Sequence, residues 1–250
     1  MIAAMNAERI KLLSTRSPYW CIAIVVVFAI AIATIMGITV NGAIASTPEE
    51  SAWTALIGIN NIGVLVLMIM AVLAVTSEYR FGTIRISFQA IPVRSTVLLA
   101  KAAVFAFLSF AVTLVLSVLA LALVRGFAGA DSMIEFGDSG VIRQIWGTPI
   151  LAALYVVIGL GVGAIVRQTA GAIVIVLIWN LAFESILSIL PKVGEHIAPF
   201  LPFANGNRFL HGGATDTDYP WNEYGSLIYF AVFAAIVFAI GVVMTERRDA

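Results

Sequence analysis

The most unusual chemistry in this sequence lies inside a long apolar run near residue 180. Asn180, Glu184 and Ser188 follow one another at intervals of four residues, so on a helix they form one polar stripe. Burying an ionised carboxylate in hydrocarbon costs about 2.5–3.5 kcal/mol on insertion scales. We therefore expect the stripe to face protein or water and not lipid. A purely structural alternative stays open, in which the carboxyl group bonds to a neighbouring helix or reaches outward to the surface.

The residues of known intramembrane enzymes are not arranged for catalysis here. A rhomboid-type protease needs a Ser in a Gly-rich loop and a His on a nearby span, but His196 and His211 lie in one connection and no Gly-x-Ser-x-Gly occurs. Glu49 and Glu50 are paired acids with no His nearby. Cys21 is the only cysteine, so neither a disulfide nor a thiolate metal cluster is expected. The chain also lacks the G-x-x-x-x-G-K-[ST] phosphate-binding loop, so it should not hydrolyse ATP itself.

Six long apolar runs dominate the chain. Each has about 20 residues or more, which at 1.5 Å per residue is enough to cross a hydrocarbon core of roughly 30 Å. The composition agrees, with 61% hydrophobic and 11% charged residues and a mean hydropathy of +1.04. We predict an all-α polytopic membrane protein with six transmembrane helices in a single domain, residues 1–250. The runs lie near Tyr19–Val40, Ala52–Thr76, Thr96–Val124, Gln144–Val166, Ala170–Leu190 and Tyr224–Met244.

The distribution of charge predicts the orientation of these spans. With an even number of crossings both termini lie on one side, and ten of the 14 Lys and Arg fall on that side. Basic residues gather on the cytoplasmic side of membrane proteins, so both termini should be cytoplasmic. The ten are Arg9, Lys11, Arg16, Arg80, Arg85, Arg94, Lys101, Arg167, Arg247 and Arg248.

The cytoplasmic connection 77–95 has the pattern of a short amphipathic helix. Gly82 and Thr83 can form a turn and an N-cap, and Pro92 can end the element. Arg85 and Gln89 lie on the polar faces. One apolar stripe recurs at i, i+4 and i+7, in Ile84, Phe88 and Ile91. A helix of this kind, parallel to the membrane, provides a surface for docking a partner.

Two further segments should lie at the membrane surface. Residues 1–17 can form an interfacial helix, with Arg9 entering its apolar arc and Ser17-Pro18 as its end. Residues 190–223 are rich in Pro and Gly and contain an apolar stretch too short to span, typical of a re-entrant or interfacial segment. Its aromatic residues and Tyr224 could form an outer rim. Connection 125–143 reads as an exposed loop. The glycines at 159, 161 and 163 are interpreted as helix-packing contacts.

One block of the sequence resembles a known family. Glu78-Tyr79-Arg80-Phe81-Gly82-Thr83-Ile84-Arg85, followed by Pro92-Val93-Arg94 and Lys101, is similar to the cytoplasmic loop of ABC-2 type transporter permeases. The six spans, the basic N-terminal segment and the external excursion before the last span are similar too, so the resemblance covers nearly the whole chain.

The resemblance implies a half-transporter in the cytoplasmic membrane of a prokaryote. Two copies, as a homodimer, would pair with two separate ATPase subunits that carry ATP and Mg, and this chain would bind no cofactor, metal or nucleic acid. Residues 83–91 would be the coupling helix, and the stripe at Asn180, Glu184 and Ser188 would face the conduit or the dimer seam. The residues expected to couple to the ATPase are Glu78, Arg80, Gly82, Thr83, Ile84, Arg85, Phe88, Gln89 and Ile91.

The function implied by this resemblance is ATP-driven export. The largely apolar spans favour an amphiphilic or hydrophobic cargo such as a drug, lipid or peptide. The main alternative is an ATP-independent secondary carrier or channel, which should place ionisable groups at the bilayer midplane. Apart from Lys101 near the cytoplasmic interface, only Glu184 is charged within the spans, with Asn60 and Asn61 adding polarity. An intramembrane enzyme is the remote alternative.

Overall fold

The computed structural model of the protein describes residues 1–39, 47–91, 93–189, 196–212 and 219–247. Every regular element in these residues is helical, and six helical stretches are long and apolar enough to cross a membrane, as the sequence predicts. The N-terminal half contains α1 (Ile2–Ser14), α2 (Arg16–Thr39), α3 (Pro48–Ile57), η1 (Gly58–Gly63), α4 (Val64–Arg80), α5 (Thr83–Ala90), α6 (Arg94–Ala128) and η2 (Gly129–Ser132). The C-terminal half contains α7 (Ser139–Val166), α8 (Thr169–Leu177), η3 (Ile178–Phe183), α9 (Glu184–Ile189), η4 (Ala198–Phe200), α11 (Pro202–Leu210) and α12 (Glu223–Arg247).

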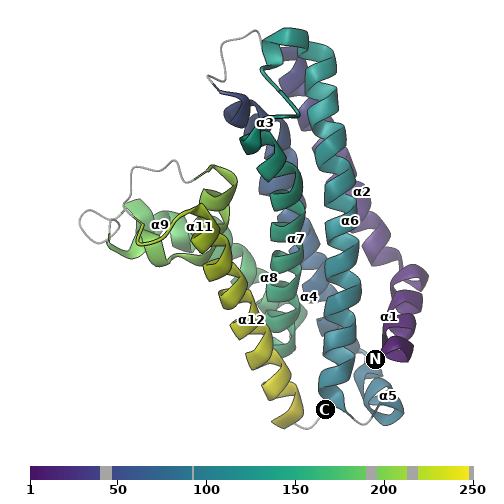
Figure 1. The fold of residues 1–250 in the computed structure, drawn as a ribbon. Coiled ribbons are helices and arrows are strands. Elements are labelled where there is room, and N and C mark those ends of the chain that lie inside the picture. Colours follow the sequence, from purple (N-terminus) through teal and green to yellow (C-terminus); the bar gives the residue numbers. More distant parts are fainter. Residues whose placement is uncertain (40–46, 92, 190–195, 213–218, 248–250) are drawn as a thin grey trace.

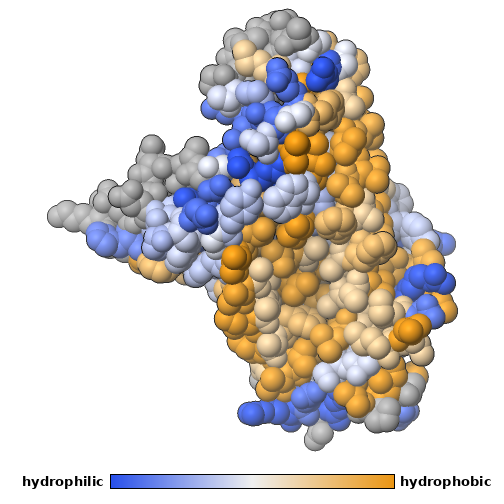
Figure 2. Space-filling view, in the orientation of Figure 1, coloured by the Kyte–Doolittle hydropathy of each residue, from blue (hydrophilic) through white to orange (hydrophobic). Residues whose placement is uncertain are grey.

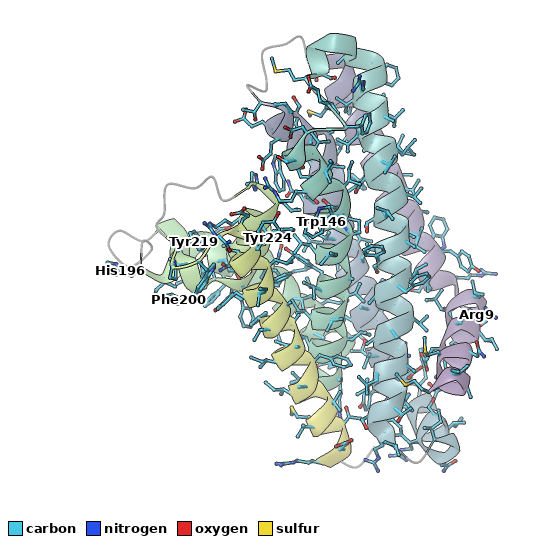
Figure 3. All side chains as sticks on the ribbon, in the orientation of Figure 1. Arg9, Trp146, His196, Phe200, Tyr219 and Tyr224 are labelled. Carbon is cyan, nitrogen blue, oxygen red and sulfur yellow. The ribbon has the colours of Figure 1, made fainter. Side chains whose placement is uncertain are left out.

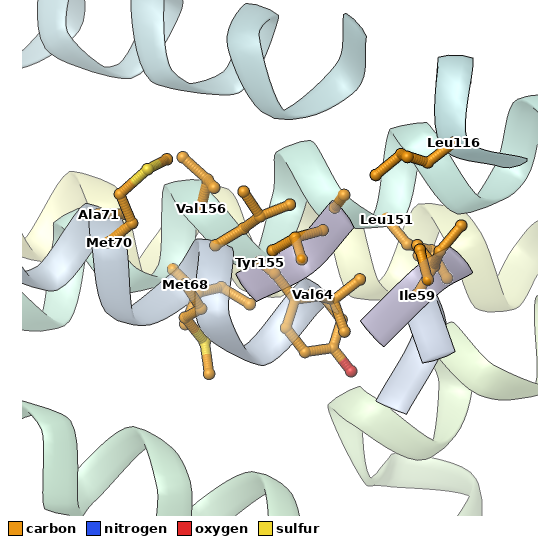
Figure 4. Close-up of a cluster of buried hydrophobic side chains, with 14 of the residues drawn as sticks. Ile59, Val64, Met68, Met70, Ala71, Leu116, Leu151, Tyr155 and Val156 are labelled. Carbon is orange, nitrogen blue, oxygen red and sulfur yellow. The ribbon is translucent and has the colours of Figure 1, made fainter. Parts of the chain in front are cut away.

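Helix α7 is the centre of the bundle and packs against α4, α6 and α12 (Figure 1). Helix α2 packs against α6 and η1. The core between α4 and α7 is built from Met68, Ala71 and Val156, all fully buried (Figure 4). Close packing of such side chains replaces the hydrophobic effect as the stabilising force once a helix is in lipid.

Small residues bring α7 and α12 into backbone contact. A Cβ placed on Gly161 would lie 2.9 Å from the Phe238 Cα, and one on Gly241 would lie 2.8 Å from the Gly161 carbonyl oxygen. Side chains larger than hydrogen do not fit at these distances, and small residues are common at helix contacts in membranes. The interpretation of the glycines in the fourth span as packing contacts is thereby confirmed for Gly161.

The surface shows the distribution expected for a membrane protein. Apolar residues cover most of the side of the molecule, while hydrophilic residues gather at the lower end and around α11 (Figure 2). The start of α1, all of α5 and the end of α12 lie together at that lower end (Figure 1). The start of the first helix, the end of the last helix and the amphipathic helix α5 therefore lie at the same end of the bundle.

Two of the spans contain a π-helical segment, and each places an Asn against α7. In η1, Asn60 Oδ1 accepts a hydrogen bond of 3.1 Å from Thr148 Oγ1. In η3, Asn180 Nδ2 donates one of 3.1 Å to Tyr155 Oη. Segments of π-helix widen a helix locally and often occur at functional sites. They explain how polar side chains are accommodated inside otherwise apolar spans.

Some local expectations were wrong. The break between α1 and α2 is at Thr15, and Pro18 lies inside the first turn of α2, where a missing N–H costs nothing. Connection 125–143 is mostly exposed as expected, but it is not a loop throughout, because α6 continues to Ala128, η2 follows and α7 begins at Ser139. Within it, Arg125 donates a 2.6 Å hydrogen bond to the carbonyl oxygen of the buried Ile134. Phe203 does not join an outer aromatic rim. It is buried, with its ring 5.1 Å from that of Tyr155.

Candidate functional site

The cytoplasmic connection holds a two-turn helix, α5, as the apolar pattern predicts. Gly82 precedes it with φ of +68°, a conformation that glycine adopts without strain, so the chain can turn sharply at the end of α4. Ile84 is buried and Phe88 is half-buried, and the Arg94 guanidinium lies 5.3 Å from the Phe88 ring centroid. The predicted apolar stripe therefore seats α5 on the body of the protein.

The opposite side of α5 is open. Arg85 and Gln89 are exposed, and Ile86 exposes 67% of its surface. Phe81, in the turn before the helix, is equally accessible, with the Arg80 guanidinium 5.6 Å from its ring centroid. This exposed face (Phe81, Arg85, Ile86 and Gln89) combines apolar and polar groups at the end of the molecule shared by both terminal helices.

A buried ionic cluster lies directly behind α5. Lys101 of α6, only 2% exposed, contacts Glu8 of α1 at 2.5 Å and Glu78 of α4 at 3.0 Å. Glu8 is as deeply buried as Lys101. Buried charges persist only when they are paired and hydrogen-bonded, which is the case here.

Lys11 completes the cluster and connects it to α5. Its ammonium group lies 2.8 Å from Glu8, 2.9 Å from Glu78 and 3.0 Å from the Ser87 hydroxyl. All three of its N–H donors are thereby used. Burial alone would lower the pKa of Lys11, but the hydrogen bonds and charges of Glu8 and Glu78 outweigh it and raise the pKa, so Lys11 is cationic at neutral pH.

The ionic cluster (Glu8, Lys11, Glu78 and Lys101) joins four elements through side chains. It connects α1 to the end of α4 and to α6, and through Ser87 it holds α5. A displacement of α5 would thus strain contacts to the N-terminal helix and to two spans at once. The arrangement can transmit movement mechanically.

The far end of α12 is tied to the same region. Arg94 Nη1 donates a 3.3 Å hydrogen bond to the Thr245 carbonyl oxygen, and the hydroxyls of Tyr79 and Thr245 lie 3.3 Å apart. Arg167, at the end of α7, lies 4.7 Å from the centroid of the Tyr79 ring. Basic residues predicted to be cytoplasmic thus converge around the last turns of α4 and α12.

Glu184 has a clear structural environment at the other end of the fifth span. Its carboxylate accepts hydrogen bonds from the backbone N–H groups of Phe203 (3.0 Å) and Ala204 (2.8 Å), in the first turn of α11. These N–H groups have no partner within the helix, and a carboxylate there also complements the helix dipole. Glu184 thus fixes α11 to the fifth span. This contact matches the structural alternative that the sequence left open, in which the carboxyl group bonds to a neighbouring helix.

The rest of the polar stripe is only partly described. Asn180, one turn before Glu184, donates a hydrogen bond to the Tyr155 hydroxyl. The Ser188 side chain lies outside the described residues. The segment 190–195, residues 213–218 and Pro92 lie outside them as well. Within the described part of segment 190–223, α11 packs against α12 and α7.

Sequence reasoning missed half of the ionic cluster. Glu78 was expected among the residues that couple to the ATPase, and Lys101 belongs to the family block. Glu8 and Lys11 of the cluster, and Ser87 beside it, were not singled out. A signal existed in α1, where Glu8 lies four residues from both Ala4 and Leu12, and these three side chains form the buried face. Ile2 and Leu13 of the same helix are exposed, as an interfacial helix requires of the side chains that face the membrane.

A scan of the chain against protein-family models and a search of curated proteins both found no match. Among the described residues, no group of three or more His, Cys, Asp or Glu side chains could hold a metal ion. The structure itself therefore describes the protein as a multi-pass helical membrane protein, in which buried paired charges hold an exposed amphipathic helix in place.

Proposed function

We propose that this protein is the permease subunit of an ATP-driven ABC exporter, in which α5 is the coupling helix. The observation that carries the proposal is the seat of α5: its apolar stripe faces the body, its other face is open, and Ser87 binds the ionic cluster. If a cytoplasmic ATPase displaced a helix held in this way, the displacement would be transmitted to α1, α4 and α6 together. The similarity of residues 78–85 to the ABC-2 loop supports the same assignment.

The proposed cargo is amphiphilic or hydrophobic. The polar side chains that the described spans bury are mostly neutral Ser, Thr, Asn and Gln, and the carboxylate of Glu184 is already bound to the start of α11. This favours ATP-driven transport over a proton-coupled carrier, which would require an ionisable group free to exchange protons within the spans. The second permease copy and the two ATPase subunits, with ATP and Mg, are part of this proposal.

Co-purification with an ABC ATPase encoded beside this chain tests the proposal. Wild-type protein should retain the ATPase in detergent. Ile86→Asp should reduce the retained ATPase at least tenfold, since it places an unpaired carboxylate in the centre of the exposed face of α5. Ile86 is a sharper probe than Phe88, because an Asp at the half-buried Phe88 would also disturb the seat of α5 on the body.

Ile142→Asp is the matched control. Ile142 is also an exposed Ile on a helix, but it lies in the first turns of α7, at the opposite end of the span from Arg167. It should leave ATPase binding unchanged. Equal binding by wild type and Ile86→Asp, or no ATPase bound to either, would contradict the coupling assignment and favour the carrier or channel.

A further inference from the structure

A cavity of about 620 Å³ lies beside the ionic cluster, between α1, the start of α2, α4 and α5. Its size is that of ligand sites, which run roughly from 300 to 1,000 Å³. One face of α4 forms a wall of the cavity, through residues that recur at helical spacing: Met70, Leu73, Ala74, Ser77 and Arg80. This wall is apolar where it lies within the span and polar where α4 ends. An occupant should therefore be an amphiphile, with its polar group near the end of α4.

The charged residues of the cavity leave a net positive charge. Six charged side chains line it, and four of them are the ionic cluster, in which two carboxylates and two ammonium groups pair with one another. The other two are Arg16 and Arg80, both exposed, and neither has a salt bridge among the described residues. These two arginines therefore set the net charge of the cavity, and their forks of N–H donors match the oxygens of a phosphate. The polar group of the occupant should be an anion.

The junction of α1 with α2 lies at the level expected for lipid headgroups. Tyr19 and Trp20 follow Arg16 by about one turn of α2, and they expose 54% and 70% of their surfaces. Exposed aromatic residues of this kind are enriched at the membrane–water interface. From Arg80 the wall on α4 extends back into the span by about 15 Å, half of a hydrocarbon core of roughly 30 Å. The two arginines thus suit the headgroup of a lipid, and the apolar wall suits its acyl chain.

We propose that this cavity binds an anionic phospholipid of the leaflet beside α5, which the charge distribution predicts to be cytoplasmic. The phosphate pairs with Arg16 and Arg80, and an acyl chain covers Met70 and Leu73. A zwitterionic lipid brings an ammonium group of its own, so it leaves the positive charge of the cavity uncompensated and binds less tightly. The inference needs only a membrane around the bundle and does not depend on an ATPase partner.

Native mass spectrometry of the delipidated full-length protein tests the proposal. The probes are phosphatidylglycerol, phosphatidylethanolamine and phosphatidylcholine with identical acyl chains. Phosphatidylglycerol should bind about tenfold more tightly than either of the others, because only its phosphate charge is not offset within the lipid. Equal binding of the three lipids, or tighter binding of a zwitterionic one, would overturn the assignment.

Arginine variants test the anion contact. Arg16→Gln should reduce the preference for phosphatidylglycerol over phosphatidylethanolamine, and Arg16→Gln combined with Arg80→Gln should remove it. Arg9→Gln is the control, since it removes the same charge from an exposed position of α1 that does not line the cavity. The preference should stay at the wild-type level in this variant. Equal loss of preference in Arg9→Gln and Arg16→Gln would overturn the location.

A pair of leucine variants tests the acyl-chain contact. Leu73→Trp fills the apolar part of the cavity and should weaken phosphatidylglycerol binding about tenfold. Leu99→Trp makes the same change at an exposed position of α6 that does not line the cavity, so binding should be unchanged. Equal weakening by the two variants would show that the chain does not enter the cavity.

Two further measurements use the wild-type protein, so they do not depend on the folding of a variant. A photoactivatable phosphatidylglycerol should crosslink to residues 70–80 or 14–18, and crosslinks confined to other segments would overturn the proposal. Glycerophosphoglycerol, which has the headgroup without acyl chains, should compete only at concentrations at least a hundredfold above the lipid. Competition at equal concentration would overturn the assignment to a lipid, because the anion would then come from solution and not from the leaflet.

Discussion

At the scale of single residues, the main feature is that paired charges are buried inside the protein, behind α5 at one end of the bundle. Glu8 and Lys101 are both 2% exposed, yet each has an opposite charge within hydrogen-bond distance. Pairs of this kind add little net stability compared with apolar residues, but breaking one leaves an uncompensated charge. Their value here lies in specifying how α1 docks on α6.

Lys101→Met should destabilise the protein by about 3–5 kcal/mol, because Glu8 and Glu78 would then share the single ammonium group of Lys11. Thermal unfolding in detergent measures the effect. Arg9→Met is the control, since Arg9 points away from the bundle on the outer side of α1 (Figure 3). Adding Glu8→Gln to Lys101→Met should restore part of the loss. Identical melting of Lys101→Met and Arg9→Met would contradict the role of the cluster.

Glu184 is also best understood through its contacts. Glu184→Gln leaves one oxygen for two backbone donors and turns its amide N–H₂ group toward the other, so about 1–3 kcal/mol of stability should be lost. Glu184→Leu leaves both donors unpaired and should cost more. Glu246→Gln, at an exposed acid near the end of α12, should be neutral.

Transport assays on the same Glu184 variants separate structure from function. If the Gln variant folds and dimerises normally but transports poorly, the charge itself serves the conduit, as the polar stripe predicts. If stability and transport are unchanged in both variants, the carboxylate neither caps α11 nor lines a path.

At the scale of elements, the parts predicted from the sequence are those whose signal is local. The six spans follow from runs of apolar residues, and α5 from a stripe that repeats within nine residues. The ionic cluster could not be predicted in the same way, since Lys101 is 93 residues from Glu8. Its formation depends on which face of α1 turns inward, and α1 buries Ala4, Glu8 and Leu12 while Ile2, Ile10 and Leu13 face outward.

The contact between α7 and α12 gives a direct test of packing at this scale. Gly161→Ala would place a methyl group 2.9 Å from the backbone of Phe238, so it should destabilise the protein by about 1–3 kcal/mol. Gly126→Ala is the matched control near the end of α6, where no atom lies within 4 Å of the added Cβ. Relief of the glycine penalty should make that variant neutral or slightly more stable. A more stable Gly161→Ala variant would contradict the close approach.

At the scale of the whole molecule, the two ends of the bundle differ in construction. The end with α5 and both terminal helices is braced by paired charges and carries the cavity, whereas the other end holds α11 on Glu184 and an ion pair between Glu49 and Arg143. Apolar faces of α2, α8 and α12 remain exposed between these ends. In a membrane these faces contact lipid or a second copy of the chain.

The orientation of the bundle decides whether α5 can meet a cytoplasmic partner. Ten of the 14 basic residues predict that the end with α5 is cytoplasmic. Single cysteines test this in a Cys21→Ala background, with a membrane-impermeant maleimide applied to intact cells. Glu135→Cys, exposed between α6 and α7, should react at once, and Ile86→Cys only after the membrane is permeabilised. A fluorescent protein fused after Ala250 should fluoresce, since it would stay in the cytoplasm. Labelling of Ile86→Cys from outside would reverse the topology, and no ATPase could then reach α5.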